Sequence, residues 1–132
     1  MQADWELSQT LTSDGQGIRC AALLPTNNNA EDSYRVITGN QAGGLVEYKV
    51  PSGNLQVVSF QHDHSVTALL DGIDCYVTGC KDSIIRIFNN TDHTVKTTLE
   101  GHEKPVTSLA WADRKERYLL AGSWDGTVKV WN

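Results

Sequence analysis

A short run of histidine and aspartate, "HDH" at His62 to His64, has the residue types of a metal site. Two imidazoles that flank a carboxylate are ligands that zinc accepts. The alternative, which we favour, makes His62 part of a structural hydrogen-bond network and His64 a surface loop residue. Cys75 and Cys80 lack the C-x-x-C spacing of a metal pair, and five positions apart in one strand they would point to opposite faces.

His102 and Asp125 could form a dyad that activates a nucleophile. The sequence has no glycine-rich phosphate loop that follows a strand and opens a helix. An enzyme is therefore the poorer hypothesis, and a metal-dependent enzyme built on the histidines is the least favoured function. We predict no catalytic residue, cofactor or metal.

Composition and net charge limit the class of protein to which these residues belong. Apolar residues make up 39% of the chain and charged ones 20%, which is typical of a globular domain. The formal net charge of −5 argues against a non-specific nucleic-acid binder and against an anionic membrane surface. No apolar run could span a bilayer, and the N-terminus shows no secretory signal. We expect a cytoplasmic or nuclear protein with reduced cysteines.

The chain repeats itself. "CYVTGCKDSIIRIFN" (Cys75 to Asn89) matches the closing "LLAGSWDGTVKVWN", and "YRVITGNQAGGLVEYKV" (Tyr34 to Val50) is a weaker copy. The aromatic residues that end the three copies, Tyr48, Phe88 and Trp131, are 40 and 43 positions apart. A period of this length indicates an array of one supersecondary unit.

Each unit is predicted to be all-β. Every copy ends in a hairpin with a Gly- or Asp-containing turn followed by apolar–polar alternation. One strand precedes each hairpin ("IRCAALL", "VTALL", "VTSLAW") and a further one precedes that ("WELSQTL", "LQVVSF", "VKTTL"). The sequence thus predicts four antiparallel strands per unit and twelve in all, in repeats at about 5–50, 55–89 and 95–132.

The third copy, "LEGHEKPVTSLAW…LLAGSWDGTVKVWN", resembles the WD40-repeat family, whose fold is a β-propeller. The resemblance implies a buried network of His, Ser or Thr, turn Asp and Trp in each blade. The matching residues are His62, Thr78 and Asp82 in the second copy and His102, Asp125 and Trp131 in the third. Ala121 replaces the Ser of the third copy, and Phe88 the Trp of the second. The first copy retains Thr38 and Tyr48, with Asp14 in place of the His and Ala42 in place of the Asp.

The same resemblance implies a partner-binding rim with three positions per blade. The matching residues are Arg19, Gln41, Ser65, Thr67, Lys81, Pro105, Thr107 and Trp124, with Gly17 also in the first copy. Trp124 and Arg19 are of types that dominate interface hot spots. The alternatives are burial of Trp124 against a neighbouring blade and simple solvation of Arg19.

A narrower resemblance is to the phospholipase-activating-protein (PLAA-like) group of ubiquitin-binding adaptors. It depends on "WELSQTL" followed by "IR", on "IRIF" and on "AGSWDGTVKVW"; the asparagine-rich insert at 26–30 departs from it. This resemblance implies ubiquitin as a protein partner and, through further domains, an ATPase segregase of the AAA class. The alternative is a WD-repeat scaffold of another signalling, RNA or chromatin assembly, since fold does not fix the partner.

Closed propellers have at least four blades, so three copies do not readily close a ring. We expect the last blade to lack its outer strand, and we favour a fragment of a longer protein over a short chain that assembles as a dimer. Such an arc would expose apolar side chains such as Val128 and Val130.

Overall fold

The structure is a computed structural model of the 132-residue protein, and it describes residues 4–12, 15–25 and 34–132. Asp14 and the insert at 26–30 lie outside the described residues. The strands are β1 Ile18–Leu24, β2 Tyr34–Asn40, β3 Leu45–Val50, β4 Leu55–Val57, β5 Val66–Asp71, β6 Cys75–Cys80, β7 Ile85–Asn89, β8 Val95–Leu99, β9 Val106–Trp111, β10 Leu119–Ser123 and β11 Val128–Trp131.

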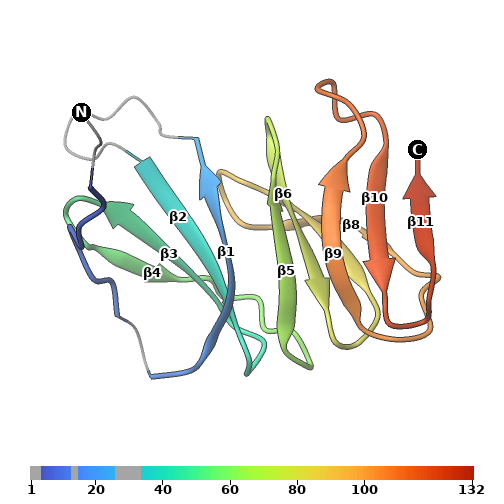
Figure 1. Cartoon of the computed structure of the whole chain (residues 1–132), viewed down its shortest axis with the longest axis horizontal. Helices are drawn as coiled ribbons and strands as arrows, with labels where there is room; N and C mark the ends of the chain where they lie inside the picture. The colour runs from blue at the N-terminus through green and yellow to red at the C-terminus, as the bar shows by residue number, and fades with distance from the viewer. Residues whose placement is uncertain (1–3, 13–14, 26–33) are drawn as a thin grey trace.

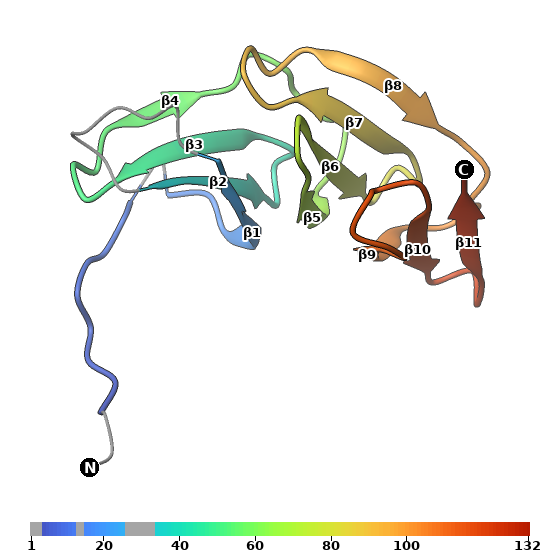
Figure 2. The ribbon, with the colours of Figure 1, turned by 90° about the horizontal axis from the view of Figure 1, so that it is seen from above.

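These strands form three antiparallel sheets, one after another along the chain. Two sheets have four strands, in the orders β1-β2-β3-β4 and β5-β6-β7-β8, and the third has three, in the order β9-β10-β11. Figure 2 shows the sheets fanned along an arc, with β1, β5 and β9 on its inner side and β4 and β8 on its outer side. The predicted all-β fold of three propeller blades is confirmed, and no strand of the described residues pairs with the outer edge of the last blade.

One predicted strand is wrong. "WELSQTL" at 5–11 forms no strand, so the described part of the chain has eleven strands where the sequence predicts twelve. The segment runs away from the arc (Figure 2), and Trp5 is fully exposed. A strand needs a neighbour for its N–H and C=O groups. The outer edges of β3 and β7 are already occupied by β4 and β8, and the free outer edge of β11 lies at the other end of the arc from this segment (Figure 2).

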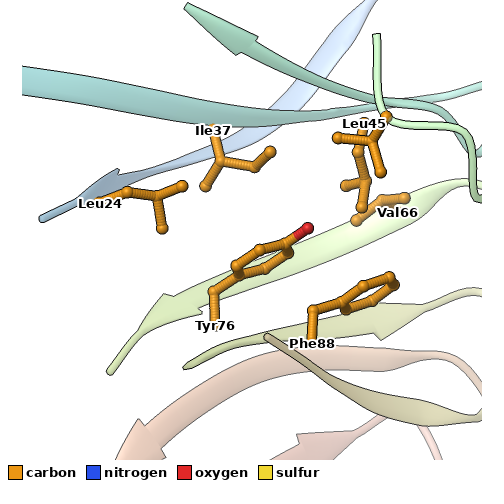
Figure 3. Packing of buried hydrophobic residues seen from close by; sticks show 7 residues of the cluster. Leu24, Ile37, Leu45, Val66, Tyr76 and Phe88 are labelled. Atoms are coloured by element: carbon orange, nitrogen blue, oxygen red, sulfur yellow. The ribbon is translucent and has the colours of Figure 1, made fainter. Parts of the chain in front are cut away.

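The core consists of two apolar clusters, each between neighbouring blades. The first joins blades one and two, where the stacked rings of Tyr76 and Phe88 pack near Ile37 and Val66 (Figure 3). The second joins blades two and three, around Val106. Because each inner strand packs beside the next (Figure 1), the starts of β1, β5 and β9 lie in a row at one end of the sheets.

A buried polar chain adds a second connection between blades one and two. Arg35 on β2 donates to Glu47 on β3 (Nε to Oε1, 2.8 Å), and His93 lies 3.4 Å from the same carboxylate oxygen. The Tyr76 hydroxyl lies 2.8 Å from His93 Nδ1. Burial raises the pKa of Glu47, but hydrogen bonds from His93 and Arg35 outweigh it and lower the pKa overall. Glu47 is therefore a carboxylate at neutral pH.

Among the residues that the structure describes, no helix is long and apolar enough to cross a bilayer. Cys20, Cys75 and Cys80 are free thiols, and burial raises the pKa of Cys20 to about 11. Val128 and Val130 on β11 are 70% and 60% exposed.

Candidate partner-binding rim

The inner strand of every blade has the same irregularity near its start. In β1, β5 and β9 the pairing register with the next strand shifts at the second residue, which is Arg19, Thr67 or Thr107. A bulge inserts an extra residue and re-aims its side chain. Three bulges at equivalent places therefore direct three side chains to the same end of the arc.

A backbone hydrogen bond recurs beside each bulge. The residue at the start of the β2–β3, β6–β7 or β10–β11 turn donates its N–H to the carbonyl just before the inner strand. The pairs are Gln41 to Gly17 (2.9 Å), Lys81 to Ser65 (2.9 Å) and Trp124 to Pro105 (3.1 Å). The turn and the inner strand are thereby held together in each blade, which fixes where the rim side chains leave the backbone.

Six of the eight predicted rim residues line one hollow of ≈270 Å³, and they come from all three blades. They are Arg19, Thr67, Lys81, Pro105, Thr107 and Trp124. Gln41 and Ser65 are not part of its lining; instead, the Ser65 hydroxyl donates to the Gln41 carbonyl at 2.6 Å. The hollow lies where the bulges of the three inner strands converge.

Trp124 is 67% exposed, so none of the three blades of this chain buries it. Its backbone is fixed on both sides. Its own N–H bonds Pro105, the preceding Ser123 donates its hydroxyl to the same carbonyl at 2.9 Å, and the following Asp125 caps the turn by accepting from the Thr127 N–H at 2.9 Å. A large apolar side chain thus projects from a rigid turn.

The network of the second blade is formed in part. His62 is buried, its Nε2 lies 3.0 Å from the Thr78 hydroxyl and its Nδ1 lies 2.9 Å from the Gly43 carbonyl. Because a carbonyl only accepts, Nδ1 carries the proton and Thr78 donates to Nε2. Burial lowers the pKa of His62, which favours this neutral form.

Asp82 is not brought to His62 by a hydrogen bond. It pairs instead with Arg86 (Nη2 to Oδ2, 2.8 Å) and accepts the Ile84 N–H at 3.0 Å. Burial raises the pKa of Asp82, but the hydrogen bonds from Arg86, the Ile84 N–H and Cys80 together outweigh it and lower the pKa overall. The ring of Phe88 packs against His62, with centroids 5.9 Å apart.

In the third blade the histidine bonds the turn aspartate and not a strand hydroxyl, which is the opposite of the second blade. His102 Nδ1 lies 2.8 Å from Asp125 Oδ2, and the His102 ring meets the Trp131 ring edge to face at 5.5 Å. Hydrogen bonds from Thr127 and His102 hold the pKa of Asp125 well below its usual range. His102 Nε2 is buried and has no hydrogen-bond partner among the described residues. Ala121 occupies the strand position that Thr78 has in the second blade.

The first blade closes its turn with a residue that the sequence did not single out. Asn40 Oδ1 accepts the N–H groups of Ala42 (3.0 Å) and Gly44 (2.8 Å), and the Gly44 bond is equivalent to the bonds that Asp82 and Asp125 accept in the other two turns. Asparagine before a Gly-rich turn is the signal that could have found it. Thr38 donates to the Val46 carbonyl at 3.2 Å, and the buried Tyr48 hydroxyl has no partner among the described residues.

The three residues of the "HDH" run do not form a common site. His62 is buried in the blade, whereas Asp63 and His64 are exposed. Within the described ranges, no three or more His, Cys, Asp or Glu side chains are grouped so that they could hold a metal ion.

The three successive antiparallel sheets are arranged as blades of a β-propeller. Residues 93–132 match the family model "WD domain, G-beta repeat". The fold resembles "Structure of U3-55K" (TM-score 0.81) and "Crystal structure of RRP9 WD40 repeats" (TM-score 0.79). Each is 21% identical, and each match covers 94% of this chain and 38% of the solved one. The chain thus has a WD40 repeat and three blades of a WD40 propeller.

Among curated proteins, the chain is similar to the ribosome biogenesis protein WDR12 homolog of Drosophila erecta. The two are 29% identical over 114 residues, which is 70% of this chain and 26% of the relative. The chain therefore spans about a quarter of that relative's length. The narrower resemblance to the phospholipase-activating-protein group finds no support in these comparisons, so ubiquitin and an AAA segregase lose their basis as partners.

Proposed function

We propose that this chain is part of a non-catalytic WD-repeat scaffold in an RNA–protein assembly of the ribosome-biogenesis kind, and that a protein partner docks on its rim. One observation carries the proposal: six residues from three blades, held by repeated bulges and turn bonds, line a single hollow. A site assembled from consecutive repeats suits recognition of a partner that spans them.

The described residues favour binding over chemistry. Three histidines have carboxylate or hydroxyl partners, and all three are buried: His62, His93 and His102. The exposed rim instead presents Trp124, Arg19 and Lys81, which are side chains of binding surfaces.

The assembly is inferred from the name of the relative, a ribosome biogenesis protein. The net charge of −5 favours a place in such an assembly through protein contacts rather than by wrapping RNA. This function places the protein in the nucleus. It replaces the ubiquitin adaptor that the narrower resemblance implied.

Sedimentation tests the proposal. The tagged chain, expressed in the cells from which it comes, is expected to sediment in part with large precursor ribosomal particles and to shift to light fractions after ribonuclease treatment. Trp124→Ala should reduce the heavy fraction, because loss of a hot-spot tryptophan weakens an interface by about 2 kcal/mol or about thirtyfold.

Trp5→Ala is the matched control, because Trp5 is equally large and fully exposed but lies on the segment that leaves the arc (Figure 2). It should leave the heavy fraction unchanged. A wild-type chain found only in light fractions would refute the assembly, and equal losses in both variants would refute the role of the rim.

A further inference from the structure

The hollow at the rim is positively charged although the chain as a whole is acidic. Its lining holds the cations Arg19 and Lys81 and no carboxylate. Among the described residues neither side chain takes part in an ion pair, whereas Arg35, Arg86 and Arg117 all do. Two uncompensated cations thus face one small space.

The other polar groups of the lining are turned toward the protein. The Thr67 hydroxyl donates to the Val106 carbonyl of the next blade, and the Thr107 hydroxyl donates to the Gly122 carbonyl at 3.4 Å. Pro105 has no N–H. The side-chain donors that remain in the lining for a ligand are therefore the guanidinium of Arg19, the ammonium of Lys81 and the indole N–H of Trp124.

This inference rests on the function proposed above. We infer that the hollow binds an acidic side chain of a protein partner, an aspartate or glutamate whose neighbour in the partner's chain is apolar. The carboxylate lies between Arg19 and Lys81, and the apolar neighbour packs on Trp124.

The chemistry of the hollow determines this class of ligand. A guanidinium presents a planar fork that matches a carboxylate with two parallel hydrogen bonds, and such charged bonds are among the strongest in proteins. Trp124, two-thirds exposed on a fixed turn, offers a rigid apolar platform beside it. An acidic residue next to an apolar one satisfies both parts of the site.

Size and charge favour a peptide over single-stranded RNA. A nucleic-acid groove needs cations that follow successive phosphates and aromatic rings that stack successive bases. A hollow of ≈270 Å³ with two cations and one aromatic ring accommodates one inserted side chain. The net charge of −5 would also repel an extended polyanion.

Selection from a library of random dodecapeptides on the full chain tests the inference without a presumed sequence. The selected peptides are expected to contain Asp or Glu beside an apolar residue. Replacing that acid by its amide in a synthetic copy should weaken binding to the wild-type chain about tenfold or more, since a hydrogen bond to a charged group contributes about 1.5–3 kcal/mol. This comparison leaves the protein unaltered, so folding cannot confuse it.

On the protein side, the double variant Arg19→Gln/Lys81→Gln should lose the same selected peptide. Lys96→Gln/Lys115→Gln is the matched control, because it removes two exposed lysines outside the hollow with the same change in net charge. Selection of peptides without acids, equal binding of acid and amide copies, or equal losses in the two double variants would each overturn the inference.

A twelve-nucleotide oligouridine serves as the competing probe in a filter-binding assay. If it binds through Arg19 and Lys81 while no acidic peptide is selected, the ligand class is RNA and the inference is wrong. A chain that sediments with particles but selects no acidic peptide overturns this inference alone. A chain that selects acidic peptides but never sediments with particles overturns the assembly alone.

Discussion

Threonine at position 121 should repair the hydrogen-bond network of the third blade. His102 Nε2 is buried without a partner, because Ala121 stands where the second blade has Thr78. In the second blade the Thr78 hydroxyl lies 3.0 Å from His62 Nε2. In the neutral imidazole, His102 Nδ1 donates to the Asp125 carboxylate and Nε2 is an acceptor, to which a hydroxyl at position 121 would donate.

The magnitude follows from the hydroxyl alone. A satisfied hydrogen bond contributes about 1 kcal/mol, and a buried unsatisfied group costs about 1–3 kcal/mol. Threonine also adds a methyl group to a tightly packed site, so valine, which has the same shape, is the comparison that isolates the hydroxyl. We expect Ala121→Thr to be about 1–2 kcal/mol more stable than Ala121→Val.

Urea denaturation of the two variants measures this difference as a shift in midpoint at constant m-value. The same pair made in a His102→Leu background completes a double-mutant cycle, in which the advantage of threonine should vanish. Equal stabilities of Ala121→Thr and Ala121→Val, or an advantage that survives without His102, would show that the orphaned nitrogen is not what the hydroxyl satisfies.

Two further predictions concern the turns and the pH range. Gly43→Ala should destabilise the protein more than Gly126→Ala does, by a margin of about 2 kcal/mol or more. Thermal unfolding of the two variants measures this difference. Both glycines have positive φ (95° and 83°), but a Cβ at Gly43 would lie 2.3 Å from the His62 carbonyl oxygen, whereas nothing lies within 4 Å at Gly126; equal losses would show that the clash relaxes. Because burial lowers the pKa of His62, its contribution to stability is present above the unfolded pKa of about 6.5 and is lost as pH falls through the folded value. Urea midpoints from neutral pH down to about pH 5 should fall more steeply for the wild type than for His62→Gln, and parallel curves would contradict a neutral buried imidazole.

The sheets could be predicted from the sequence because the information is local and repeated. The hairpins β2–β3, β6–β7 and β10–β11 each combine alternation with a turn signal, and the period of the closing aromatics sets the blades apart. The segment at 5–11 has the same local pattern: "LSQTL" reads like the "VKTTL" of β8. It forms no strand because pairing requires a neighbouring strand edge, which alternation within a segment cannot report, and the free edge of β11 lies at the other end of the arc (Figure 2).

The polar contacts were less predictable for a similar reason. Asp82 was expected to bond His62, yet Arg86, four residues along the same hairpin, takes its carboxylate. The sequence does not indicate the buried connection from Arg35 through Glu47 to Tyr76, because it joins residues of two blades whose charges look like ordinary exposed positions of alternating strands. Which of several nearby partners a buried charge adopts depends on packing that spacing does not encode.

The three blades share the backbone geometry of their turns and bulges but differ in the side chains at those positions. All three turns hold the same geometry, but the group that accepts their N–H bonds is Asn40 in one blade, Asp82 in the next and Asp125 in the third. The bulge geometry is likewise shared, while the bulged residue changes from Arg19 to threonine. Different side chains can satisfy one backbone requirement, so the backbone of the rim is a property of the fold. The side chains of the two cations and of the tryptophan at the hollow fulfil no such requirement, so under the proposed function they are the part of this chain that selects a partner.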